Sequence, residues 1–113
     1  MSKITKNIFL GSDFDAKNLK KLKKFNISAI VISARVLSKY HKKHFKYFQF
    51  EIADTPETLI LHHWLKAFKF MDRFIKKNLN VFVHCMLGVS RSSATVIAYL
   101  MYSERISYYK ALD

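Results

Sequence analysis

The chain has 113 residues, half of them hydrophobic, and a formal net charge of +12 at pH 7. This length predicts a single domain over residues 1–113, and the hydrophobic share excludes a disordered chain. No stretch reaches the ~18 apolar residues of a membrane span, and residues 1–4 contain no apolar signal core. The single cysteine excludes an internal disulfide and fits a reducing compartment, so we expect the protein in the cytoplasm or nucleus.

Strands and helices are expected to alternate along the chain. Short apolar runs predict strands over residues 8–10, 29–32, 45–50 and 81–83. Helical spacing predicts helices over residues 16–25, 56–77 and 92–103, and a last helical turn from Ser107 through Leu112. The expected inward-facing residues of these helices are Leu19, Leu22 and Phe25, then Leu61, Trp64, Leu65, Phe68, Met71 and Ile75, then Val96, Ile97, Leu100 and Met101. The predicted fold class is α/β, with a central, mostly parallel sheet flanked by helices.

The most informative stretch lies between the strand at 81–83 and the helix at 92–103, and it reads His84-Cys85-Met86-Leu87-Gly88-Val89-Ser90-Arg91-Ser92. A loop that precedes a helix N-terminus attracts anions, because the first backbone N–H groups have no intrahelical partners. Gly88 permits a tight bend, and the Arg91 guanidinium can bind two phosphate oxygens at once. The same field favours the thiolate form of Cys85, a strong nucleophile toward a phosphoryl group held above it.

This stretch resembles the His-Cys-x5-Arg-Ser signature of cysteine-dependent protein tyrosine phosphatases. The flanks Ala98-Tyr99-Leu100-Met101 and Ile8-Phe9-Leu10-Gly11-Ser12 resemble the dual-specificity branch of that family, and the resemblance covers nearly the whole chain. It implies that Cys85 attacks phosphorus to form a phosphocysteine, which water then hydrolyses. It also implies that Arg91 and the backbone N–H groups of residues 86–91 bind the phosphate, that Ser92 hydrogen-bonds the cysteine sulfur, and that His84 supports the loop. No cofactor is expected, and the histidines form no metal-binding set.

The resemblance further implies an upstream aspartate as the general acid. Asp54 lies 31 residues before Cys85, between the predicted strand at 45–50 and the Thr55-Pro56 pair that is expected to begin a helix. We therefore expect Asp54 to be the acid, with Glu51 and Glu57 as the other nearby carboxylates. The alternative is that Asp54 only caps a loop or helix.

The positive charge is supplied mostly by lysine, which accounts for 16 of the 20 basic residues and clusters at residues 17–24 and 39–46. This charge attracts anionic partners such as phosphopeptides, phosphoinositide head groups or RNA. The alternative is a solvated surface, and the excess of lysine over arginine argues against a dedicated nucleic-acid surface.

The expected partners are phosphorylated proteins, and the expected activity is hydrolysis of phosphotyrosine and of phosphoserine or phosphothreonine. One alternative is the same chemistry on other anionic phosphate esters, either phosphoinositides or RNA 5′-triphosphate ends. The predicted loop argues against phosphoinositides, because lipid-acting relatives often place lysines there and its side chains Met86, Leu87, Val89 and Ser90 include none. RNA-acting relatives often have Asn before the arginine and Thr after it, whereas this chain has Ser90 and Ser92. A second alternative is a non-catalytic phosphate-binding module. Domains of the resembling branch continue beyond the region matched by Ala111-Leu112, so we expect this chain to lack their final helix.

Overall fold

The computed structural model of the protein contains one five-stranded sheet in the order β1-β2-β5-β3-β4. Its strands are β1 (Ser2–Lys3), β2 (Ile8–Ser12), β3 (Ile27–Ile32), β4 (Lys46–Gln49) and β5 (Asn80–Cys85). The β1 strand, which the sequence did not predict, runs antiparallel to β2, and all other neighbouring strands are parallel. The mostly parallel sheet of an α/β fold is therefore confirmed. The structure describes residues 1–34, 37–50, 57–85 and 90–112, without the side chains of 57–61, 90–91 and 106–112.

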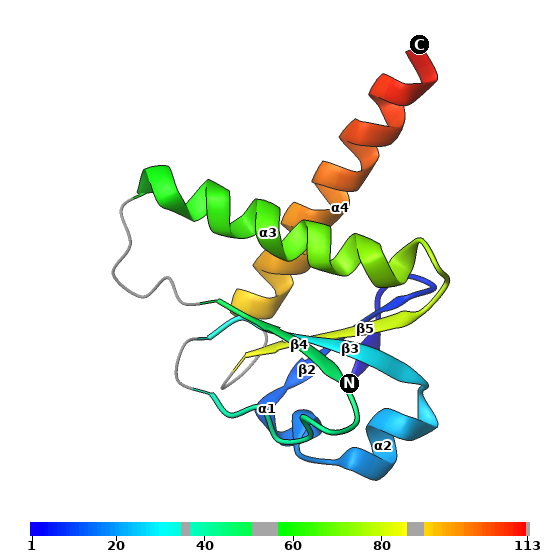
Figure 1. Cartoon of the computed structure of the whole chain (residues 1–113), viewed down its shortest axis with the longest axis vertical. Helices are drawn as coiled ribbons and strands as arrows, with labels where there is room; N and C mark the ends of the chain where they lie inside the picture. Colours follow the sequence, from blue (N-terminus) through cyan, green and yellow to red (C-terminus); the bar gives the residue numbers. More distant parts are fainter. Residues whose placement is uncertain (35–36, 51–56, 86–89, 113) are drawn as a thin grey trace.

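The helices are α1 (Asp13–Ala16), α2 (Leu19–Lys24), α3 (Glu57–Ile75) and α4 (Ser90–Leu112). The long helices α3 and α4 lie on one face of the sheet, and the short helices α1 and α2 lie on the other (Figure 1). The core is accordingly split into two apolar clusters, one on each face. Along β5, Val81 and Val83 belong to the cluster under α3 and α4, whereas Phe82 belongs to the other cluster. This alternation follows from the two-residue period of a strand.

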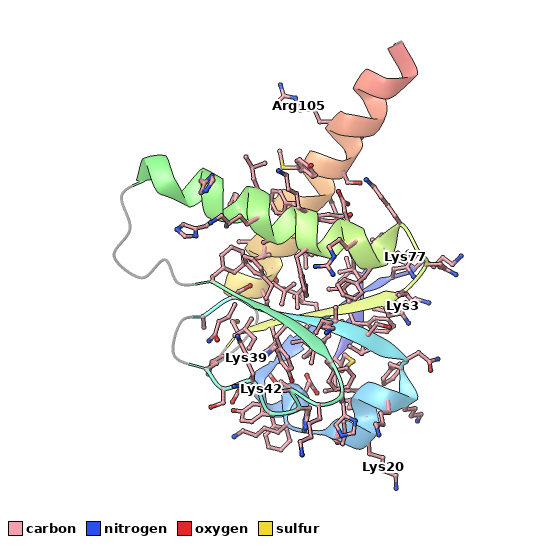
Figure 2. All side chains as sticks on the ribbon, viewed as in Figure 1. Lys3, Lys20, Lys39, Lys42, Lys77 and Arg105 are labelled. Carbon is pink, nitrogen blue, oxygen red and sulfur yellow. The ribbon has the colours of Figure 1, made fainter. Side chains whose placement is uncertain are left out.

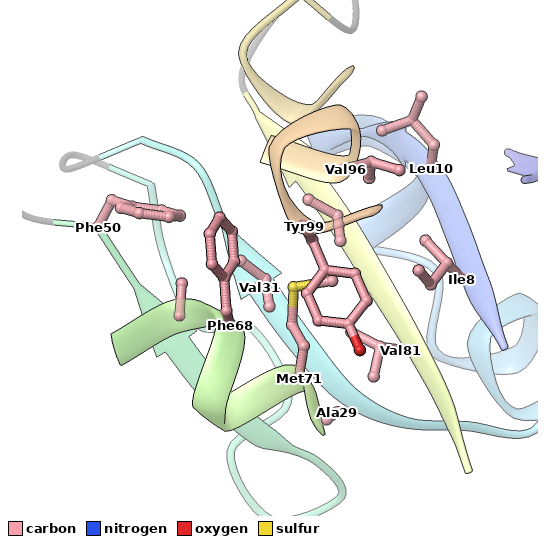
Figure 3. Packing of buried hydrophobic residues seen from close by; sticks show 12 residues of the cluster. Ile8, Leu10, Ala29, Val31, Phe50, Phe68, Met71, Val81, Val96 and Tyr99 are labelled. Carbon is pink, nitrogen blue, oxygen red and sulfur yellow. The ribbon is translucent and has the colours of Figure 1, made fainter. Parts of the chain in front are cut away.

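The cluster under α3 and α4 also holds the two helices together. Figure 3 shows Phe68 and Met71 of α3 and Tyr99 of α4 over the strand residues Val31 and Val81. The Tyr99 hydroxyl donates a hydrogen bond to Asp72 at 2.5 Å, and burial together with this carboxylate raises the pKa of Tyr99.

The predicted core positions of α3 are confirmed, because Phe68 and Met71 are buried and Trp64, Leu65 and Ile75 are partly buried. The side chain of Leu61 lies outside the described part.

The helix predicted over residues 16–25 is confirmed only in part, because α2 covers residues 19–24 and residue 16 ends the separate short helix α1. A capping box between Ser12 and Asp15 starts α1 early, and the Asn18 side chain accepts a hydrogen bond from the backbone N–H of Lys21 to start α2. Leu22 is fully buried as predicted. Phe25 lies just beyond α2 and is 36% exposed, so its predicted inward position was wrong.

The final helix also differs from the prediction. α4 continues without a break through residues 103–107, so no separate turn begins at Ser107, and its C-terminal half projects away from the sheet (Figure 1). Ile97 and Met101 are 59% and 66% exposed rather than packed inward. Val96 is buried and Leu100 is partly buried, so these two predicted inward positions are confirmed. The helix face toward the sheet is formed by four buried residues at helical spacing, which are Ser92, Thr95, Val96 and Tyr99. Two of these four residues are polar, so a prediction made from apolar residues alone assigned the wrong residues to part of the inward face.

Candidate active site

The predicted nucleophile lies at the carboxyl end of β5, the strand at the centre of the sheet. Cys85 stands opposite Ser12 of β2, and the preceding residue His84 stands opposite Gly11 of β2 and Ile32 of β3. The Cys85 side chain is 2% exposed. Ligand sites of open α/β sheets form at the carboxyl ends of the strands, so Cys85 occupies the expected edge.

A contact between the strand and the following helix fixes the thiol. The Cys85 sulfur lies 3.5 Å from the Ser92 hydroxyl oxygen, and both side chains are buried. α4 begins at Ser90, so Ser92 lies in its first turn, where backbone N–H groups have no intrahelical acceptors. The contact predicted between Ser92 and the cysteine sulfur is therefore present, whereas the catalytic role of Ser92 stays a prediction.

Several predicted site residues fall outside the described part of the structure. These are Asp54 and the loop residues Met86, Leu87, Gly88 and Val89. Ser90 and Arg91 belong to the first turn of α4, but their side chains are not among those described. The phosphate cradle and the general acid therefore stay predictions from the sequence.

His84, the residue before Cys85, is fully buried, and its ring stacks on Phe82 with the ring centres 5.4 Å apart and the planes at 15°. Among the described residues, neither ring nitrogen has a hydrogen-bonding partner. Burial lowers the pKa of His84, although the Cys85 backbone and the carboxylates of Asp13 and Asp15 favour the charged form. His84 is therefore neutral near pH 7 and contributes to the site by packing rather than by charge.

The acidic residues of α1 near this edge have partners of their own. Asp13 accepts hydrogen bonds from the Tyr40 hydroxyl at 2.9 and 2.8 Å. Burial alone would raise the pKa of Asp15, but the Lys21 ammonium, the Ser12 backbone and the N-terminal ammonium together hold it below its ordinary value. Both carboxylates therefore have a structural function in α1, directly after β2.

A polar contact that the sequence analysis missed joins the site to β3. The backbone N–H of Ser33 donates to the carbonyl oxygen of His84 at 2.8 Å, and the Ser33 hydroxyl lies 2.9 Å from the hydroxyl of Thr95 in α4. Ser33 therefore holds both the strand that ends in Cys85 and the helix that carries Ser92. The available signal was a small polar residue directly after the buried apolar run of β3.

Within the described ranges, no group of three or more His, Cys, Asp or Glu side chains is placed to bind a metal ion. The same ranges contain no helix that is long and apolar enough to cross a membrane.

Comparisons with known proteins agree with this geometry. A family model described as dual specificity phosphatase, catalytic domain, matches residues 8–113. Protein phosphatase Slingshot homolog 3 from Mus musculus is 36% identical over 100 residues, which cover 88% of this chain and 15% of that protein. Dual specificity protein phosphatase 1B from Arabidopsis thaliana is 33% identical over 113 residues, which cover the whole chain and 68% of that protein.

Solved structures share the fold as well. The human tyrosine phosphatase-like serine/threonine/tyrosine-interacting protein superposes with a TM-score of 0.77 at 31% identity, over 97% of this chain and 78% of that one. A leucine-rich repeat and phosphatase domain-containing protein from Entamoeba histolytica gives a TM-score of 0.74 at 28% identity, over 97% and 72% of the two chains. The chain spans only 11–17% of the length of the Slingshot proteins from mouse, fruit fly and human.

Proposed function

Because the chain belongs to the family of dual specificity phosphatase catalytic domains, we propose that it is a protein phosphatase that hydrolyses phosphotyrosine and phosphoserine or phosphothreonine. The observation that carries this proposal is the 3.5 Å contact between the Cys85 sulfur and the Ser92 hydroxyl at the carboxyl end of the central strand. It supports the roles proposed for Cys85 as the nucleophile and for Ser92 as the donor to the departing sulfur, since Ser92 lies in the first turn of the long helix α4. The Ser92 hydroxyl and the N-terminus of α4 both favour negative charge on the sulfur. They therefore suit a cysteine that alternates between the thiolate and a phosphoryl ester.

The proposed reaction has two steps. The Cys85 thiolate attacks phosphorus, and the bond from phosphorus to the substrate oxygen breaks while Asp54 gives its proton to that oxygen. A water molecule then attacks the phosphocysteine, Asp54 takes a proton from it, and the sulfur–phosphorus bond breaks. Ser92 donates a hydrogen bond to the departing sulfur anion, which lowers the barrier of the second step. Arg91 and the first N–H groups of α4 stabilise the phosphoryl oxygens throughout.

A second candidate function is a non-catalytic phosphate-binding module. One structurally similar human protein is described as phosphatase-like and as an interacting protein, and this chain resembles it over 97% of its length. The buried pair of Cys85 and Ser92 favours catalysis instead, because a binding module needs neither a thiol nor a donor aimed at it.

The test measures hydrolysis of nitrophenyl phosphate and of a doubly phosphorylated peptide by the purified chain. We expect Cys85→Ser to abolish turnover on both substrates and still to bind the oxyanion vanadate. Asp54→Ala should slow an alkyl phosphate far more than nitrophenyl phosphate, whose leaving group needs no proton. Turnover of the Cys85→Ser variant near that of the parent would refute the proposal, and equal slowing of both substrates would remove Asp54 as the acid.

Neighbouring serines provide a matched control for the second step. Ser92→Ala should slow phosphocysteine hydrolysis by about 10–100-fold, since a hydrogen bond to a charged group contributes about 1.5–3 kcal/mol. A burst of nitrophenol followed by slow turnover is the expected trace. Ser93→Ala, one residue along and half-buried, should leave the trace unchanged. An equal effect of the two substitutions would assign Ser92 a structural function only.

A further inference from the structure

The parallel strands have a second hollow region at their other end. A cavity of about 680 Å³ opens at the amino ends of β3 and β5, where Asn7, Asn78 and Asn80 line it. The Asn7 side-chain amide donates to the side-chain oxygens of Asn78 and Asn80 at 3.1 and 3.0 Å, and Asn80 donates to the carbonyl of Phe25 at 3.0 Å. Asn26 and Asn78, both at this cavity, adopt left-handed backbone conformations with φ of 55° and 59°. The floor of the cavity is therefore an ordered amide network.

A second hollow of about 520 Å³ adjoins the first, and His44 lines both. Its wall is the segment 39–44, which is held in place by hydrogen bonds to α1 and β4. The His41 ring nitrogen lies 3.0 Å from the carbonyl oxygen of Ala16, and the His41 backbone N–H donates to the Tyr47 hydroxyl at 3.0 Å. The Tyr40 hydroxyl donates a hydrogen bond to Asp13. Asp13 directly follows Ser12, the last residue of β2, which stands opposite Cys85 in the sheet. The two hollows, which we call the basic groove, thus lead from the amino ends of the strands toward the catalytic edge.

The charge of the basic groove is positive throughout. Its described lining contains no carboxylate and six lysines, which are Lys3, Lys6, Lys23, Lys39, Lys42 and Lys43. In Figure 2, Lys39 and Lys42 lie toward the end of the sheet where β5 finishes, and Lys3 lies at the opposite end. Within the described ranges the lysines in ion pairs are Lys17, Lys21 and Lys76, so none of the groove lysines pairs with a carboxylate there. The groove therefore concentrates positive charge that nothing described in this chain neutralises.

We propose that the basic groove binds an acidic segment of the phosphoprotein substrate while the phosphorylated residue occupies the Cys85 site. This inference rests on the proposed function. β5 has six residues and so separates the two ends of the sheet by roughly 16 Å, a span that about five residues of extended chain would cover. An acidic stretch about five or more residues from the phosphorylated side chain would therefore reach the groove.

The shape and composition of the groove favour a peptide over other polyanions. Its concave walls and fixed amide floor do not match the plane of lipid head groups. Single-stranded nucleic acid is bound on successive exposed aromatic rings, yet Phe45 is only 7% exposed and the Tyr40 ring, though 36% exposed, already faces the Lys17 ammonium 5.6 Å from its centre. Asn side chains offer both donors and acceptors, which suit a peptide backbone beside its carboxylates.

The test compares two triple variants of equal charge. Lys6, Lys23 and Lys42 are changed to Glu in the groove variant, and Lys20, Lys66 and Lys69 are changed to Glu in the control variant, none of which lines the groove. Each variant has a net charge of +6, since each substitution lowers the parent value of +12 by two. The substrates are a phosphotyrosine peptide with four glutamates about six residues from the phosphotyrosine on each side, the same peptide with glutamines, and nitrophenyl phosphate.

For the acidic peptide, kcat/KM of the groove variant should fall about tenfold, mostly through KM, and that of the control variant less than about threefold. The glutamine peptide and nitrophenyl phosphate should be hydrolysed at nearly parental rates by both variants. A Lys→Gln version of the groove variant, with its Tm measured, separates this effect from misfolding. Equal losses in the two Glu variants, or no preference of the parent for the acidic peptide, would overturn the inference.

Two further outcomes are decisive. If the groove substitutions weaken binding of RNA or of phosphatidylserine vesicles but leave the kinetics with the acidic peptide unchanged, the occupant is not an acidic peptide. If the parent shows no Cys85-dependent hydrolysis of nitrophenyl phosphate, the proposed function fails instead. In that case the fluorescence anisotropy of the labelled acidic peptide still decides whether the groove binds it, because this measurement needs no catalysis.

Discussion

A methyl group added at Gly11 tests how closely β2 approaches the neighbours of Cys85. Gly11 stands opposite His84 in the sheet. An added Cβ would lie 2.6 Å from a carboxylate oxygen of Asp15 and 2.8 Å from the ring of Phe82, distances that real Cβ atoms do not adopt. Gly11→Ala must therefore displace both of these side chains.

Neither neighbour can move without cost. Phe82 is fully buried and stacks on His84, so its displacement costs the ~1–3 kcal/mol that is typical of an overpacked core. Asp15 is bonded to the Ser12 backbone and to Lys21, and loss of such a helix cap costs about 1 kcal/mol. Together these effects lower the free energy of unfolding by about 2–4 kcal/mol, which for a domain of this size lowers Tm by about 8–16 °C.

Urea unfolding followed by the fluorescence of Trp64, the single tryptophan, measures this change. A double-mutant cycle with Phe82→Leu identifies the cause, because the smaller side chain makes room for the methyl group. We expect Gly11→Ala to cost at least about 1 kcal/mol less in the Phe82→Leu background. A single-variant cost below about 1 kcal/mol would contradict the close approach, and a cost that is unchanged by Phe82→Leu would exclude the Phe82 ring as the obstacle.

Two further predictions concern the groups around the thiol. Ser33→Ala and Thr95→Val should each lower the free energy of unfolding by about 1 kcal/mol, and the double variant should show a coupling energy of similar size. Both substitutions should also lower kcat, because the contact between the two hydroxyls positions the first turn of α4. Additive effects of the two substitutions on stability would exclude the contact. His84 has a lowered pKa in the folded state, so its contribution to stability is complete above the unfolded value of about 6.5 and is lost as pH falls below it. Between pH 7 and 5.5 the free energy of unfolding should therefore fall by up to about 1 kcal/mol in the parent and stay nearly constant in His84→Asn, whereas equal slopes in both proteins would refute this assignment.

The sequence predicted best where one physical rule dominates. The run Ala29–Ile32 is apolar without interruption because β3 is an inner strand of the sheet, covered on both faces. The position of Cys85 followed from a strand, a loop and a helix in succession, because parallel strands place such loops at one edge. The long helix predicted to end at residue 77 ends two residues earlier, at Ile75, and in the turn that follows Asn78 has a φ of 59°, a conformation that asparagine tolerates.

The predictions were wrong where polar contacts decide the structure. The inward face of α4 contains Ser92 and Thr95, which are buried because Cys85 and Ser33 offer them partners across the core. A pattern of apolar residues cannot reveal such pairs, since their partners come from distant parts of the chain. The break between α1 and α2 likewise depends on the Asn18 cap, a local hydrogen bond that starts a new helix just before Leu19 and Leu22, and apolar spacing does not reveal it.

The alternation of side chains along β5 explains which side chain of the site contacts α4 and which one packs in the opposite half of the core. Val81 and Val83 face α3 and α4, so Cys85, two residues further, faces α4 as well and contacts Ser92. Phe82 and His84 face the opposite way, so the histidine ring stacks in the core beside α1 rather than beside the reacting sulfur. The same two-residue period that fills both halves of the core thus directs the thiol to the helix N-terminus and the imidazole away from it. For this reason a neutral, buried His84 contributes to the site through packing, whereas the described side chain that contacts the sulfur, Ser92, comes from α4.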